Sequence, residues 1–288
     1  MRYGVAVPNF GSTGDARTLV DLARRTEDAG WDGFFVWDHL LGDVTWRVPT
    51  ADAFTALAAV AQATSRIHLG PMVAAVPRRH PAVLARETVT LDHVSDGRLI
   101  LGVGLGWPSE ADFGWFGGEA DVRRRAEMLD ESLAVLDGLW RGEPFSHAGR
   151  HYQVNEVTFL PRPLQRPRIP VWVGSLRPGR RGPLRRAARW DGFAPAAEDG
   201  ARDPGVFAAD VAEVLRMRTE AGLAPGGTFD VCASGMTPAG DLATADETIA
   251  PHAAAGATWW LEIVSDWLGG LDAIRRRVSD GPPRASAG

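Results

Sequence analysis

Several polar residues lie where short apolar stretches of the sequence end, and these side chains are the best placed for chemistry. Asp38 and His39 directly follow the apolar stretch GFFVW. A neutral imidazole can accept a proton near pH 7, so His39 is a candidate acid–base group beside a carboxylate. Its position is equally compatible with a polar loop residue. The other polar side chains at such points are Asn9, Arg78, Arg79, His80 and Glu262.

Glycines end another apolar stretch, in the segment GVGLGW (102–107). The segment lacks the full GxGxxG spacing of a dinucleotide-binding turn, which argues against a Rossmann site. Because glycine has no side chain, Gly104 and Gly106 could let a flat ring lie directly on the backbone. The same glycines would also suit a tight exit from a strand, so both interpretations stay open.

A candidate anion site follows at Gly174 and Ser175, which begin a loop that leads into a predicted helix. Backbone N–H groups at the start of a helix attract anions, and phosphate sites of α/β barrels often use late loops. Arg177, Arg180 and Arg181 would add charge-assisted hydrogen bonds there. They could equally be ordinary surface arginines.

Missing residue types exclude several kinds of chemistry. All 31 basic residues are Arg, which excludes mechanisms that need a Schiff-base or Walker-type lysine. No HxH, HExxH or GxSxG motif occurs, so we expect neither a metal centre nor a hydrolase nucleophile. The single Cys232 can form neither an internal disulfide nor a zinc site by itself.

The polar residues need elements that bring them together, and the sequence predicts alternating strands and helices. Apolar residues recur every three or four positions over 122–140, as in an amphipathic helix. Eight strands, each followed by a helix, predict a single closed (β/α)8 TIM barrel, with an open doubly wound sheet as the alternative. The carboxyl ends of barrel strands share one face, where active sites lie. The strands are expected at 3–8, 33–38, 67–73, 98–103, 171–173, 192–195, 229–236 and 258–264.

Two parts of the chain fall outside this pattern. Residues 142–169 contain four prolines and form an excursion between the fourth helix and the fifth strand. Residues 280–288 are typical of a frayed tail. We therefore expect one barrel domain at 1–279 and a flexible tail at 280–288, although a norm of roughly 150 residues per domain would suggest two domains.

Composition limits the partners. The net charge is −5 and the isoelectric point about 5.8, which argues against nucleic acid binding. No apolar stretch approaches the ~20 residues that span a bilayer, and the first residues lack a signal-peptide pattern. We therefore expect a cytoplasmic protein without a membrane segment. The chain has 11 Trp but only 2 Tyr, so tryptophans fill the core or line a pocket for a flat ring.

Five segments carry motifs that occur together in one protein family. They are AGWDGFFVWDHL (29–40), RIHLGPMVAAVPRRHPAVLARETVTLDHVSDGRLILGVGLGW (66–107), LWRGEPFSHAGRHYQV (139–154), PRPLQRPRIPVWVGS (161–175) and RRAARWDGFAP (185–195). In order and spacing they resemble the bacterial luciferase-like family of flavin-dependent oxidoreductases. The resemblance implies a (β/α)8 barrel that binds a flavin or the deazaflavin coenzyme F420 at its mouth, and a homodimer.

The resemblance also implies roles for individual residues near the coenzyme ring. Asp38 and His39 match an acid–histidine pair close to the ring. Met72 and Val73 match a bulge in the third strand, often a non-prolyl cis peptide, that supports the ring. Pro71 precedes them here, which leaves the local geometry open.

Four small residues match the rest of the coenzyme site. Gly104 and Gly106 match the backbone beside the ring, and Gly174 matches a glycine that contacts phosphate. Ser175 stands where the family usually has a second glycine, so it could donate a hydrogen bond or narrow the site. Arg177 and Arg180 complete the expected cofactor-binding set.

The expected substrate pocket is apolar. Related deazaflavin-dependent sugar-phosphate dehydrogenases have Glu at the position of Trp107 and bind the substrate phosphate through lysines, which this chain lacks. Trp107, Trp46, Phe113 and Trp115 instead suggest a pocket for an apolar or aromatic substrate, unless they only pack the loops.

Three functions remain open. The first is hydride transfer between diffusible F420 and a small-molecule substrate, with His39 moving the substrate proton. The second is an FMN-dependent monooxygenase that uses reduced FMN and oxygen. The third is a non-catalytic flavin-binding protein, which the departures at Pro71, Ser175 and Trp107 keep open.

Overall fold

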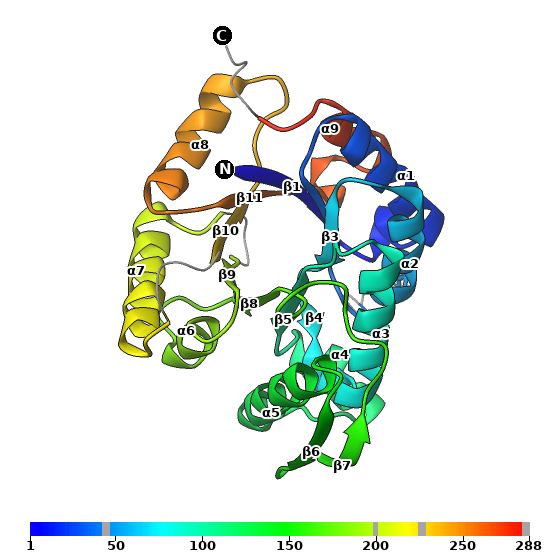
Figure 1. The fold of residues 1–288 in the computed structure, drawn as a ribbon. Helices are drawn as coiled ribbons and strands as arrows, with labels where there is room; N and C mark the ends of the chain where they lie inside the picture. The colour runs from blue at the N-terminus through cyan, green and yellow to red at the C-terminus, as the bar shows by residue number, and fades with distance from the viewer. Residues whose placement is uncertain (42–46, 198–200, 224–228, 284–288) are drawn as a thin grey trace.

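The computed structural model shows a barrel of parallel strands inside a ring of helices (Figure 1). It describes residues 1–41, 47–197, 201–223 and 229–283. All neighbouring strands of the barrel are parallel, as strands joined by crossover helices are. Their order is β3 (His68–Pro71), β2 (Gly33–Val36), β1 (Arg2–Val7), β11 (Trp259–Ile263), β10 (Asp230–Gly235), β9 (Gly192–Pro195), β8 (Val171–Ser175), β5 (Leu101–Gly104) and β4 (Ala74–Ala75).

β3 lies within the strand predicted at 67–73, and β4 follows directly after it; Met72 and Val73, joined by a cis peptide bond, separate the two. β3 pairs with β2, whereas β4 pairs with β5. A parallel bridge between Leu69 and Leu99 joins β3 to the residues before β5 and closes the barrel. The predicted TIM barrel is confirmed, and the open sheet is wrong.

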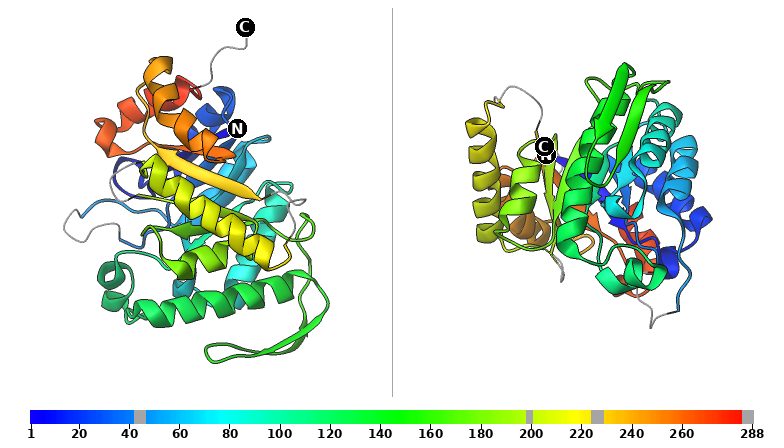
Figure 2. Two further views of the ribbon diagram at one scale, coloured as in Figure 1. Left: turned by 90° about the vertical axis from the view of Figure 1, so that its left-hand side faces the viewer. Right: turned by 90° about the horizontal axis from the view of Figure 1, so that it is seen from below.

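Helices follow the strands around the outside of the barrel (Figures 1 and 2). Five of them begin after an aspartate whose carboxylate accepts a backbone N–H of the first turn, which satisfies one otherwise unpaired donor. The short α4 (Ser109–Asp112) lies in the loop after β5. The others are α1 (Ala16–Asp28), α2 (Ala53–Ala63), α3 (Pro81–Val94), α5 (Val122–Trp140), α6 (Arg181–Ala187), α7 (Pro204–Glu220), α8 (Leu242–Ala254) and α9 (Leu271–Ser279).

The predicted excursion contains an antiparallel hairpin of β6 (Pro144–Ala148) and β7 (Gln153–Thr158). It lies along α5, outside the barrel (Figure 2). Glu131 of α5 holds the hairpin, because its carboxylate accepts the backbone N–H of His151 at 3.0 Å and that of Tyr152 at 2.6 Å. The hairpin is thus attached to an outer helix and not to the barrel sheet.

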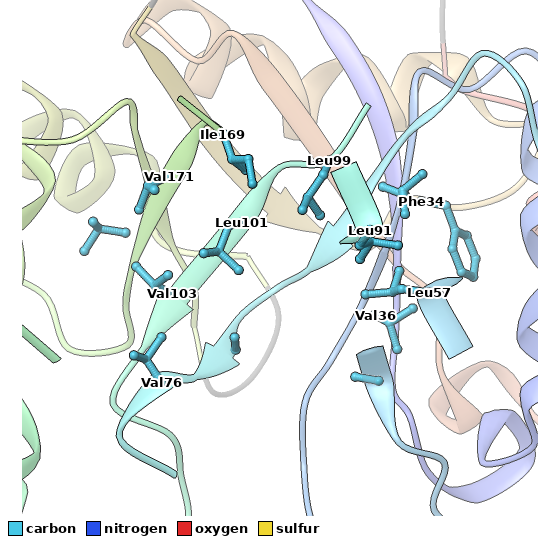
Figure 3. Close-up of a cluster of buried hydrophobic side chains, with 14 of the residues drawn as sticks. Phe34, Val36, Leu57, Val76, Leu91, Leu99, Leu101, Val103, Ile169 and Val171 are labelled. Carbon is cyan, nitrogen blue, oxygen red and sulfur yellow. The ribbon is translucent and has the colours of Figure 1, made fainter. Parts of the chain in front are cut away.

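Two apolar clusters form the core. One contains no helix residue and fills the barrel interior, where the rings of Trp172 and Trp259 lie 5.3 Å apart and Phe35 packs against both. The larger cluster lies between strands and helices, and Figure 3 shows Leu101 of β5 beside Val171 of β8. Part of the tryptophan excess therefore belongs to the core.

Replacing Leu101 by Ala tests the packing of the larger cluster. The side chain of Leu101 is fully buried, so Leu101→Ala should lower the free energy of unfolding by about 2–5 kcal/mol, measured by urea denaturation. Leu160 is 58% exposed, and Leu160→Ala should have little effect. Equal losses in the two variants would contradict the packing described here.

Candidate active site

The predicted polar residues gather at the carboxyl ends of neighbouring strands. Asn9 follows β1, Asp38 and His39 follow β2, and Arg78 and Arg79 follow β4. Because β1, β2 and the β3–β4 strand are neighbours, these residues share one face of the barrel. Hydrogen bonds join Asn9 to His39, and both arginines to Asp38.

Asp38 anchors two arginines. Its Oδ1 lies 2.9 Å from Nη2 of Arg78 and 2.9 Å from Nη2 of Arg79, and its Oδ2 accepts the backbone N–H of Ala75 at 3.0 Å. Burial by itself would raise the pKa of Asp38, but the hydrogen bond from Arg79 and the charges of both arginines hold that pKa below its ordinary value. Asp38 is therefore suited to positioning its neighbours, and its predicted place in the catalytic pair beside His39 stays a prediction.

His39 is fixed through both its backbone and its ring. Asn9 accepts the backbone N–H of His39 at 3.0 Å and donates to its carbonyl oxygen at 2.8 Å. Nδ1 of the ring lies 3.0 Å from Oδ2 of Asp112, and the edge of the ring meets Phe10. The side chain of His39 is 19% exposed, so the group stays open to the mouth of the barrel.

Asp112, at the end of α4, was not predicted as a site residue. Its Oδ1 accepts the backbone N–H groups of Leu40 and Leu41, each at 3.1 Å. Its Oδ2 faces Nδ1 of His39 and Nη1 of Arg78, the latter at 3.3 Å. Three donors and Nδ1 of His39 thus converge on one carboxylate that is 1% exposed. The one available signal was an acidic residue in the loop after a glycine-rich strand end.

The residues expected beside a coenzyme ring also come together. The Met72–Val73 peptide is cis, at the position that the resemblance implied. A Cβ atom on Gly104 would lie 2.6 Å from Cγ2 of Val73, and one on Gly174 would lie 3.0 Å from Cγ1 of the same residue. A side chain at Gly104 would thus collide with Val73, and one at Gly174 would crowd it, so Met72, Val73 and the two glycines share one small region.

Gly106 and Phe113 form a separate contact. Gly106 has φ +77°, and a Cβ atom there would lie 2.7 Å from the Phe113 ring, so glycine is required twice over. Arg125 of α5 stacks on the Phe113 ring at 4.1 Å and donates to the carbonyl oxygen of Gly106 at 3.3 Å. Phe113 is 1% exposed, because Arg125 and Gly106 cover it.

The residues expected to line an aromatic pocket differ in their exposure. Trp107 and Trp115 are 59% and 60% exposed in the loop after β5. Phe113 packs beneath this loop and does not form part of its surface. Trp46 lies outside the described residues.

The loop after β8 presents the expected cations. Ser175 is buried, and its Oγ lies 3.3 Å from the carbonyl oxygen of Arg177. Arg177 and Arg180 are exposed, and in the described ranges no carboxylate forms an ion pair with either.

A buried ion pair that sequence reasoning missed shapes this loop. Arg202 pairs with Asp210 at 2.5 Å and donates to the carbonyl oxygen of Ser175 at 2.7 Å. Asp210 also accepts the backbone N–H of Gly179 at 2.9 Å. The loop after β8 is thus held from α7 and from the residues before it.

Glu262, at the end of β11, belongs to a separate network. It accepts hydrogen bonds from the backbone N–H of Thr237 at 2.6 Å and from Nε1 of Trp260 at 3.0 Å, and pairs with Arg277 at 3.3 Å. Burial raises the pKa of Glu262 despite these partners. The network joins β11 to α9 and has a structural role.

The described ranges also bear on metal binding and on membrane insertion. Among those residues, no group of His, Cys, Asp and Glu side chains is arranged to hold a metal ion. In the same ranges, no helix has the length and apolar character needed to cross a bilayer.

Comparison with known proteins places the chain in a family. The family model described as luciferase-like monooxygenase matches residues 1–266. An F420-dependent glucose-6-phosphate dehydrogenase from Nakamurella multipartita is 32% identical over 183 residues, which are 61% of this chain and 50% of that protein. The chain spans about half the length of the curated relatives it matches.

Two solved structures share the fold over nearly their whole length. The F420-dependent tetrahydromethanopterin reductase from Methanopyrus kandleri has a TM-score of 0.75 at 19% identity, covering 97% of this chain and 98% of that one. A monooxygenase from Streptomyces bottropensis has a TM-score of 0.74 at 20% identity, covering 96% of each chain. Together with the family model, the barrel and the residues at its mouth lead to one conclusion: this chain belongs to the luciferase-like monooxygenase family.

Proposed function

We propose that the chain is an oxidoreductase that uses F420 for hydride transfer to or from an apolar or aromatic small molecule. One observation carries the proposal: Nδ1 of His39 is held by Asp112, while Nε2 has no hydrogen-bond partner among the described residues. A ring fixed in this way can exchange a proton through its free nitrogen. The curated relative that is F420-dependent supports this choice of coenzyme.

The residues at the mouth fit such a coenzyme. When bound, F420 supplies the hydride donor or acceptor, and the protein supplies position and electrostatics. We propose that Met72 and Val73 support its ring, and that the backbone of Gly104 and Gly106 lies beside it. Arg177 and Arg180 are exposed and unpaired in the described ranges, which suits an anionic tail that passes Gly174 and Ser175.

The proposed substrate is apolar because of what borders the mouth. Trp107 and Trp115 expose large apolar rings in the loop after β5, next to the segment that contains Asp112. Such surfaces are typical of pockets for apolar ligands. The F420-dependent relative acts on glucose 6-phosphate by its name, but the absence of lysine leads us not to propose a sugar phosphate here.

An FMN-dependent monooxygenase is the second candidate function. The likeness to a monooxygenase structure, with a TM-score of 0.74, favours it. In that case the exposed tryptophans would shield the reduced flavin from water. We further propose a cytoplasmic homodimer that takes up the reduced coenzyme by diffusion, and sedimentation analysis would test the dimer.

The choice of coenzyme, and the proposed tail site, can be tested by titration. F420 should bind at micromolar concentrations and more tightly than FMN, measured by quenching of tryptophan fluorescence. The double substitution Arg177→Ala and Arg180→Ala should weaken F420 binding about tenfold or more, because charge-assisted hydrogen bonds are lost.

Arg185, exposed on α6, provides the matched control, and Arg185→Ala should leave binding unchanged. An equal loss in this control would mean that only general surface charge attracts the coenzyme. Tighter binding of FMN would favour the monooxygenase, and binding of neither coenzyme would contradict both functions.

His39→Ala should separate chemistry from binding. Loss of a general acid–base group typically lowers turnover by about 10²–10⁴-fold, while coenzyme affinity should change little. Turnover would be followed by coenzyme absorbance with a panel of apolar alcohols, ketones and aldehydes. His93 lies in the last turn of α3, so His93→Ala is the control and should retain full turnover. Unchanged turnover in His39→Ala would contradict a role of His39 in the mechanism. No turnover in the wild-type protein would indicate a non-catalytic flavin-binding protein.

A further inference from the structure

Asp112 contacts His39 in a way that selects which ring nitrogen has the proton. Oδ2 of Asp112 lies 3.0 Å from Nδ1 of His39. The same carboxylate accepts the backbone N–H groups of Leu40 and Leu41, and faces Arg78. An ionised carboxylate can only accept hydrogen bonds, and it already accepts from Leu40, Leu41 and Arg78. A hydrogen bond between Oδ2 and Nδ1 of His39 therefore needs the proton on Nδ1.

We propose that Asp112 is a positioning residue that holds His39 as the Nδ1–H tautomer, which leaves Nε2 as the atom that exchanges a proton with the substrate. The second half of this inference rests on the proposed function. In the described ranges Nε2 has no hydrogen-bond partner, and the ring is partly exposed. The hydrogen bond at one nitrogen of a histidine generally fixes the role of the other.

Two arginines hold this arrangement in place. Arg78 bridges Asp112 to Asp38, which ties the loop after β5 to the end of β2. Arg125 donates from α5 to Gly106 O and to Ser109 Oγ, at 3.3 and 2.5 Å, at the start of the segment that contains Asp112. The side chain of Arg125 is 1% exposed, so this contact is internal to the protein.

Asp112→Asn should reverse the tautomer. The backbone N–H groups of Leu40 and Leu41 require an acceptor at the position of Oδ1, so the amide oxygen should stay there. The amide NH2 then faces Nδ1 of His39 and can only donate to it, which forces the proton onto Nε2. An acid-to-amide change beside a catalytic histidine is known to produce the wrong tautomer, with a fall in turnover of about 10⁴-fold.

Nitrogen-15 NMR of histidine-labelled protein measures the tautomer directly, without coenzyme or substrate. The wild-type His39 signals, assigned by their absence in His39→Gln, should show a protonated Nδ1, and those of Asp112→Asn a protonated Nε2. Asp121→Asn is the matched control, because Asp121 caps α5 by accepting the backbone N–H of Arg124 and asparagine caps equally well. Its His39 tautomer should equal that of the wild type.

A wild-type His39 protonated at Nε2 would overturn the inference, even if Asp112→Asn fails to fold. An unchanged tautomer in folded Asp112→Asn would overturn it as well. The coenzyme titration is a separate readout, in which Asp112→Asn should bind F420 within about twofold of the wild type while turnover falls. If the tautomer reverses but no coenzyme binds to either protein, the tautomer assignment is supported and the proposed function is wrong.

Discussion

The pairing of four charged side chains, removed from water at the mouth of the barrel, constrains everything around them. Asp38 and Asp112 are 2% and 1% exposed, and Arg78 and Arg79 are each 14% exposed. An unpaired charge in such a place costs several kcal/mol, so the loops after β2, β4 and β5 must keep the pairs together. This constraint also fixes the position of His39, because His39 follows Asp38 in the chain and its ring contacts Asp112.

In this network, the charged side chains at the mouth of the barrel mainly hold one another in place. The two carboxylates and two guanidinium groups neutralise one another and are occupied by their mutual contacts. The glycines also have a packing role, because a side chain at Gly104 would collide with Val73 and one at Gly174 would crowd it, whether or not a ring lies on them. The glycines can therefore serve both a tight exit from the strand and a surface for a flat ring. The ring surface remains a proposal.

The sequence was informative where regular geometry determines position. Alternating strands and helices predicted the barrel, and the rule that chemistry lies at strand ends selected Asp38 and His39. Asp112 and Arg125 could not be found in this way, because partners in a three-dimensional network leave no spacing in a loop rich in glycine and aromatic residues. The burial of Phe113 beneath the same loop could not be predicted either, because it depends on Arg125 of α5. The β6–β7 hairpin was not predicted, because the prolines at its start and after it are typical of irregular structure.

NMR during a titration with F420 shows most directly whether a coenzyme ring binds next to His39. The His39 imidazole signals should shift in proportion to bound coenzyme, while those of His93, at the C-terminal end of α3, should stay constant. Saturable binding of F420 that leaves the His39 signals unchanged would contradict the account, because the coenzyme would then occupy another part of the protein.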